Sequence, residues 1–303
     1  MGKNQYTSII RLLLHIGLDP NSSLNLQRLR KQLMIEFNMS STGFISIDDF
    51  IYTRQSVFEE LEKPDFEERL IFHRLIWQLP VILNCLEKNR FNLAGMANSF
   101  RPLVNRKGFC VFFSPYFVDP FCYASRSLQN DGKFEELGIL LSFSQYLTPE
   151  NTEEAYRPIR TYLDETMHNL KNISKDNYLI MRPKIQSWVE NNWYSFLNNL
   201  PSEFFSIKCD LAGLMINLCV KIQRNNKKDC CRISEQLMLL TDLPSNIRDI
   251  IVKNDLVFSR YKYLLNQKST NIESKDKPSI GSKIYKIIIL FFILSKIAGC
   301  LLK

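Results

Sequence analysis

Oxygen-bearing residues recur at short intervals in one segment near the N-terminus of the chain. They are Asn38, Ser40, Thr42, Phe44 (through its backbone carbonyl), Ser46 and Asp49. Calcium in proteins is held by six to eight oxygen atoms of this kind, from side chains and backbone carbonyls. Calcium affinity depends on charged donors, and Asp49 is the single carboxylate in the set. The composition therefore favours a calcium-free turn over a metal site.

The spacing of this segment resembles the loop of an EF-hand. Gly43 takes the sixth position, where a sharp turn requires glycine, and Ile45 takes the eighth. Helices expected over Leu24–Phe37 and Ile47–Leu61 flank the loop. The resemblance implies a non-enzymatic scaffold with a calcium-responsive loop, and Ca²⁺ is the one candidate cofactor.

Residues that commonly perform catalysis are scattered along the chain. His15, His73 and His168 are isolated, and the eight cysteines include no C-x-x-C pair and no spacing suited to zinc. The sequence has no nucleophile elbow, phosphate-binding loop or dinucleotide fingerprint. We therefore expect no enzyme activity, and we expect buried free thiols in a reduced, cytoplasmic setting.

A second segment has apolar residues at helical spacing on both sides of a polar turn. The turn begins at Asn89, and the apolar positions are Leu75, Leu79, Ile82, Met96 and Phe100. This spacing predicts a helical hairpin in which the five side chains share one buried cluster.

The hairpin resembles the paired helices of Rho GTPase-activating (RhoGAP) domains, where N-K-M is followed by N-L-A-x-x-F-x-P. Asn89-Arg90-Phe91 stands at the family's turn, and Met96-Ala97, Phe100 and Pro102 keep its spacing. The resemblance implies a helical bundle over residues 1–172 that binds a small GTPase or another protein. The candidate partner-binding residues are Asn89, Arg90, Asn92, Asn98 and Arg101.

The catalytic features of that family are missing here. A RhoGAP arginine finger accelerates GTP hydrolysis by about 10³–10⁵, but no G-x-F-R-x-S-G loop occurs in the chain. Before residue 40 only Arg11, Arg28 and Arg30 occur, each in an apolar-periodic helix. The family's second functional asparagine falls at Gly95. The sequence thus indicates a catalytically silent interaction module, and it leaves open a generic helical hairpin.

Few glycines and helical periodicity predict an all-α fold. Pro80 should kink or end a helix, and a minor extended hairpin is expected near Phe109–Val118, around Pro115. The predicted parts are a RhoGAP-like domain (1–172), a second helical block (173–265), a flexible linker (266–282) and a tail helix (283–303).

The tail is apolar from Ile284 to Leu302, apart from a few polar positions such as Lys296, which can snorkel. Lysines precede it, as they precede membrane spans on the cytosolic side. The pattern favours an anchor on the cytosolic face of a membrane over a helix that docks in the protein core. A net charge of +8 without a recognisable nucleic-acid module argues against nucleic acid as partner.

Overall fold

The computed structural model describes residues 6–22, 25–103, 106–190 and 192–270. It divides into two compact units, Met1–Phe258 and Ser259–Lys303, and the contacts below belong to the first. The fold is mostly helical, which confirms the predicted all-α class at that level.

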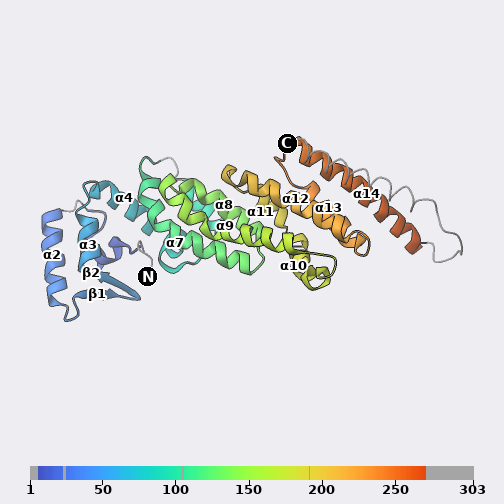
Figure 1. Cartoon of the computed structure of the whole chain (residues 1–303). Helices are drawn as coiled ribbons and strands as arrows, with labels where there is room; N and C mark the ends of the chain where they lie inside the picture. Colours follow the sequence, from blue (N-terminus) through green and yellow to red (C-terminus); the bar gives the residue numbers. More distant parts are fainter. Residues whose placement is uncertain (1–5, 23–24, 104–105, 191, 271–303) are drawn as a thin grey trace, which may run out of the picture. The chain divides into compact units, whose positions relative to one another are not determined.

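The α-helices of the described part are numbered in chain order, and most of them are labelled in Figure 1. They are α1 (Ile9–His15), α2 (Leu26–Met39), α3 (Arg54–Leu61), α4 (Phe66–Trp77), α5 (Pro80–Lys88), α6 (Leu93–Phe100), α7 (Phe109–Asn130), α8 (Phe134–Ser142), α9 (Pro149–Asn172), α10 (Tyr178–Glu190), α11 (Trp193–Asn198), α12 (Phe205–Ile222), α13 (Lys227–Met238) and α14 (Ser245–Thr270). Two short 3₁₀ helices are η1 (Phe143–Tyr146) and η2 (Ser202–Phe204).

A β-hairpin stands where the sequence predicts the start of a helix. Strand β1 (Phe44–Ile47) pairs antiparallel with β2 (Phe50–Thr53), and helix α3 begins only at Arg54. The expected helix over Ile47–Leu61 is therefore wrong in its first part. Aromatic and β-branched residues alternate between buried and exposed along β2, which is the period of a strand.

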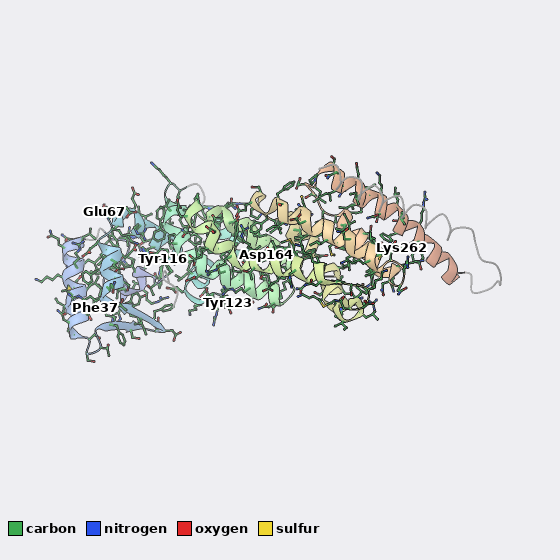
Figure 2. The ribbon with its side chains drawn as sticks, in the orientation of Figure 1. Phe37, Glu67, Tyr116, Tyr123, Asp164 and Lys262 are labelled. Carbon is green, nitrogen blue, oxygen red and sulfur yellow. The ribbon has the colours of Figure 1, made fainter. Side chains whose placement is uncertain are left out.

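The N-terminal elements α1, α2, β1, β2 and α3 enclose one hydrophobic core. Leu12, Leu33 and Leu61 are almost completely buried in it, and Phe37 of α2 contributes its ring (Figure 2). This core requires the strands, because β2 supplies the buried side chains of Phe50 and Tyr52.

The extended hairpin expected near Phe109–Val118 is wrong, because α7 is one continuous helix across this region. Both Pro115 and Pro120 lie inside it. Each proline removes a backbone hydrogen bond, but five phenylalanines between and around the prolines are almost completely buried along α7. These residues are Phe109, Phe112, Phe113, Phe117 and Phe121. Burial of this stripe outweighs the lost bonds.

The break at Pro80 is as predicted. Helix α4 ends at Trp77, and α5 begins with Pro80 in its first turn. A backbone N–H at that position would have no hydrogen-bond partner within the helix, so proline removes no bond there. The two helices pack against each other.

Helices on both sides of residue 172 are in contact. Helix α7 packs on α8 and α9, α8 packs on α11, and α9 packs on α12 (Figure 1). The boundary at 172–173 remains a prediction. Helix α14 continues through Thr270, into the segment predicted as a linker.

The predicted tail, 283–303, lies outside the described residues. Within the part that the structure describes, no helix combines the length and the apolar character that a membrane crossing requires.

Candidate functional site

Helices α5 and α6 are in contact and are joined by a turn that two asparagines close. Asn89 adopts the left-handed conformation, with φ of 50°, and its N–H donates to the carbonyl of Cys85 over 3.1 Å. The side chain of Asn92 accepts a hydrogen bond from the N–H of Gly95 over 3.0 Å and caps α6. Asn89 thus determines where α5 ends, and Asn92 determines where α6 begins.

The inner side of the hairpin is apolar. Ile82, Met96 and Phe100 are fully buried, as predicted, and the ring of Phe100 stacks on Tyr146 with centroids 4.1 Å apart. Leu75 and Leu79 are only half-buried, contrary to the expectation. The inner face of α4 is instead occupied by Ile76, whose side chain is 0% exposed.

The five candidate partner-binding residues are all exposed. Asn92 already serves as the cap of α6, so its side chain has a structural role. Arg90, Asn98 and Arg101 have no polar side-chain partner among residues 6–22, 25–103, 106–190 and 192–270. Their side chains are therefore available to a binding partner.

The hairpin region carries an unbalanced positive charge. Between residues 78 and 108 the basic side chains are Lys88, Arg90, Arg101, Arg106 and Lys107, and all are exposed. The one acid of this segment, Glu87, is buried and takes two hydrogen bonds of 2.8 Å from Arg11. No carboxylate of the segment therefore offsets the exposed cations.

The calcium-loop candidates are only partly brought together. The hydroxyls of Ser40 and Thr42 lie 2.9 Å apart, and Ser40 donates to the carbonyl of Phe44 over 2.6 Å. Asn38 lies within α2, while Ser46 and Asp49 belong to the β-hairpin. In the described part of the chain, no group of three or more His, Cys, Asp or Glu residues is placed to hold a metal ion.

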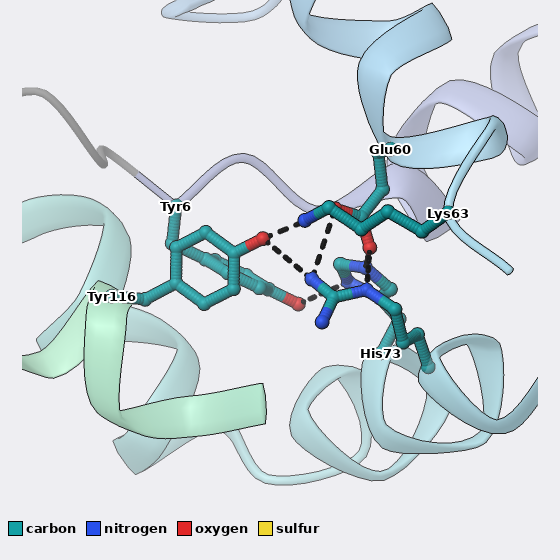
Figure 3. Close-up of polar contacts among 6 residues, drawn as sticks. Tyr6, Glu60, Lys63, His73 and Tyr116 are labelled. Atoms are coloured by element: carbon teal, nitrogen blue, oxygen red, sulfur yellow. Dashed lines mark hydrogen bonds and ion pairs between the residues drawn. The ribbon is translucent and has the colours of Figure 1, made fainter. Parts of the chain in front are cut away.

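A buried polar cluster, which the sequence does not reveal, joins α3, α4, α7 and the N-terminal segment (Figure 3). Its centre is the Glu60 carboxylate, which accepts from Arg69 Nε over 2.6 Å and from Lys63 Nζ over 2.7 Å. The members of this cluster, called here the Glu60 cluster, are Tyr6, Glu60, Lys63, Arg69, His73 and Tyr116.

The remaining bonds of the Glu60 cluster determine the tautomer of His73. Its Nε2 lies 3.2 Å from Glu60 Oε1, and its Nδ1 lies 2.9 Å from the hydroxyl of Tyr6. The carboxylate can only accept, so Nε2 carries the proton and Nδ1 accepts from Tyr6. Tyr116 donates to Glu60 over 3.2 Å and accepts from Arg69 over 3.0 Å.

Burial and hydrogen bonding oppose each other in this cluster. Burial alone would raise the pKa of Glu60, but bonds from His73 and Arg69 outweigh it and hold the pKa well below its usual range. Burial lowers the pKa of His73, so the neutral ring is favoured. The cluster therefore contains an ionised carboxylate beside a neutral imidazole, and its polar atoms satisfy one another rather than a substrate.

His73 is isolated in the sequence, and its partners explain why. Its hydrogen-bond partners Tyr6 and Glu60 lie 67 and 13 positions from it along the chain, and within the cluster only Arg69, one helical turn away in α4, is a local neighbour. The one usable signal is the presence of charged residues on the apolar side of α4.

An apolar depression lies between α10, α11, α12 and α13. The indoles of Trp188 and Trp193 stack along it, with centroids 5.5 Å apart, and Met215 and Leu237 also line it. It holds little more than one water-sized molecule, which is too small for a substrate.

Comparison of the chain with protein-family models, with curated proteins and with solved structures found no match.

Proposed function

We propose that the protein is a catalytically silent, RhoGAP-like interaction module that binds a small GTPase or another protein through the exposed face of the α5–α6 hairpin. The observation that carries this proposal is the division of the hairpin into two sides. Met96 and Phe100 are fully buried, while Arg90, Asn98 and Arg101 are exposed and have no polar side-chain partner within the part of the chain that the structure describes. A rigid scaffold with uncommitted polar side chains is typical of a recognition surface.

The charge of the hairpin supports an acidic partner. Five exposed cations and no exposed acid occur between residues 78 and 108. Complementary charge accelerates association and guides orientation, and its effect weakens as salt rises. Binding through this face should therefore be strongest at low ionic strength.

The positions of the early arginines support the absence of catalysis. Arg11 is held by Glu87 and its guanidinium lies 3.9 Å from the ring centroid of Phe50. Arg28 and Arg30 lie within α2 rather than in an extended loop. An arginine finger must reach into the partner's nucleotide site, and none of these three is placed on a loop that could do so.

The test measures binding of the full chain to Rho-family GTPases loaded with a non-hydrolysable GTP analogue. We expect Arg90→Glu combined with Arg101→Glu to weaken binding at least tenfold. Arg126→Glu, an exposed arginine on α7, should leave it unchanged. Equal binding by all three proteins would exclude the hairpin face.

A GTP-hydrolysis assay with the same panel tests the silent character separately. We expect no acceleration by the full chain. A hydrolysis rate raised about a hundredfold would indicate that an arginine of this chain enters the GTPase site, and it would contradict this part of the proposal.

Membrane attachment through residues 284–302 is the second part of the proposed function. It is supported by the apolar sequence and by the lysines that precede it. Cells expressing the chain with and without residues 283–303 should differ on fractionation, with only the longer form in the membrane pellet. Two soluble forms would contradict the anchor.

A calcium-responsive scaffold is the alternative function. The convergence of oxygens from Ser40, Thr42 and Phe44 supports it. These three groups carry no charge, so we expect calorimetry to find no calcium binding tighter than about 100 µM. Tighter binding, lost in Asp49→Asn, would favour the alternative.

A further inference from the structure

Two cysteines face each other across the α12–α13 helical hairpin. Cys219 lies near the end of α12 and Cys230 near the start of α13, and their residues are 2% and 0% exposed. The thiol of Cys230 donates to the backbone carbonyl of Cys219 over 3.5 Å. The thiol of Cys219 lies 4.0 Å from the carbonyl of Cys230. Each sulfur therefore lies beside the main chain of the other residue.

The two residues also influence each other electrostatically. The nearby Cys230, together with burial, raises the pKa of Cys219 well above its ordinary value. A disulfide requires the two Cβ atoms to approach within about 3.5–4.5 Å, and the reciprocal thiol–carbonyl contacts place the two residues next to each other across the hairpin. The neighbouring Cys231 is directed elsewhere, since its thiol donates to the carbonyl of Phe258 over 3.4 Å.

We propose that Cys219 and Cys230 form a redox-active pair that hydrogen peroxide converts into a disulfide. One thiol, as its thiolate, attacks a peroxide oxygen, the O–O bond breaks, and a sulfenic acid and one water are formed. The other sulfur then attacks the sulfenic sulfur, the S–O bond breaks, and a second water leaves. The two thiols lose two electrons in total, and one peroxide is reduced to two waters.

Burial determines how fast this reaction occurs. The nucleophile is the thiolate, and a buried, protonated thiol reacts only when the hairpin opens locally. The pair therefore responds to sustained rather than brief oxidation. Once formed, the disulfide closes a short loop and should stabilise the α12–α13 hairpin.

The test treats the full chain with hydrogen peroxide and maps disulfides by mass spectrometry after tryptic digestion without reduction. The peptide 209–221 contains both Cys209 and Cys219, and the peptide 229–232 contains both Cys230 and Cys231. The experiment is therefore repeated in a Cys209→Ser/Cys231→Ser variant, where each peptide keeps one cysteine. We expect the linked pair of peptides in both proteins, and a melting temperature raised by roughly 5 °C that dithiothreitol reverses.

The added change Cys219→Ala, in the same variant, should abolish the link and the rise in melting temperature. A link present in the wild type but absent from the double variant would assign the bond to other cysteines and overturn the proposal. Sulfinic acid on Cys219 or Cys230 without any linked peptide would overturn it as well. If the double variant does not fold, fragment-ion sequencing of the linked wild-type peptides identifies the two sulfurs directly.

Discussion

Glu60 joins more charged and polar groups than any other residue of the Glu60 cluster. Its carboxylate compensates Arg69, whose side chain is only 10% exposed. Removing one partner of a buried ion pair leaves the other charge uncompensated and costs about 3–5 kcal/mol. We therefore expect Glu60→Gln to lower the free energy of unfolding by about 3 kcal/mol in a denaturant titration.

Glu59→Gln is the matched control for this prediction. Glu59 precedes Glu60 in α3 but is exposed, and its partner is the side chain of Gln55. Its loss should change the unfolding free energy by less than about 0.5 kcal/mol. Equal effects of the two substitutions would mean that the Glu60 cluster contributes nothing beyond an ordinary surface carboxylate.

His73 makes the stability of the fold depend on pH. Burial lowers its pKa in the folded protein, whereas in the unfolded chain it binds a proton below about pH 6.5. As pH falls below about 6.5, the unfolded state therefore binds more protons than the folded state. The contribution of His73 to the free energy of unfolding is thus fully present above about pH 6.5 and decreases as pH falls below that value.

A pH series tests this sign. The unfolding free energies of the wild type and His73→Gln are measured between pH 5.5 and 7.5, so that all other titrating groups cancel in the difference. The wild-type advantage should shrink toward pH 5.5 by up to about 1.4 kcal/mol per unit of pKa shift. If the difference in unfolding free energy between the two proteins stays constant across the series, His73 has the same pKa in the folded and unfolded states, which would contradict the prediction.

The sequence predicted single-residue environments well only where they follow from local spacing. The burial of Met96 and Phe100 follows from a helical period, and it is confirmed. The bond between Tyr6 and His73 joins residues 67 positions apart, and the Cys219–Cys230 contact depends on how two helices face each other. No local pattern encodes either pairing, because only the tertiary fold brings the residues together.

At the scale of elements, α7 shows how packing overrides local preference. Pro115 indicated a break in the helix, yet the phenylalanine stripe of α7 is buried along one continuous helix. A proline inside a helix removes one hydrogen bond, and exchange for alanine restores it. We expect Pro115→Ala to leave the helix content unchanged by circular dichroism and to raise the free energy of unfolding by about 1 kcal/mol.

Pro149→Ala provides the control for α7. Pro149 occupies the first turn of α9, where no intrahelical bond is missing, so its exchange should have an effect of less than about 0.5 kcal/mol. A loss of helix content in Pro115→Ala would show that the proline determines the shape of α7 rather than being tolerated by it.

The β-hairpin was missed for a related reason. The residue types of β2, from Phe50 to Thr53, are typical of a strand. Four residues are too few, however, to distinguish the two-residue alternation of a strand from the 3.6-residue period of a helix. In contrast, the break at Pro80 was predicted correctly: proline has no backbone N–H and therefore fits the first turn of a helix, where that N–H would have no partner, and Pro80 begins α5.

At the scale of the molecule, aromatic contacts join the two sides of the predicted boundary at residue 172. Phe196 of α11 lies 6.2 Å from Phe134 of α8, and Phe204 of η2 lies 5.5 Å from Tyr156 of α9, centroid to centroid. Arg160 also places its guanidinium over the ring of Phe204. A boundary between independent domains would have few such contacts.

Truncation at residue 172 distinguishes a true boundary from a continuous core. Residues 1–172 lose the rings of Phe196 and Phe204, and burial of each large side chain contributes about 1.5–3 kcal/mol. We expect this fragment to bind the dye ANS and to unfold at a denaturant midpoint well below that of residues 1–258, which keep the first compact unit whole. Equal midpoints without dye binding would establish residues 1–172 as a domain that folds by itself, and the contacts of Phe134 and Tyr156 would then be an interface between domains rather than part of one core.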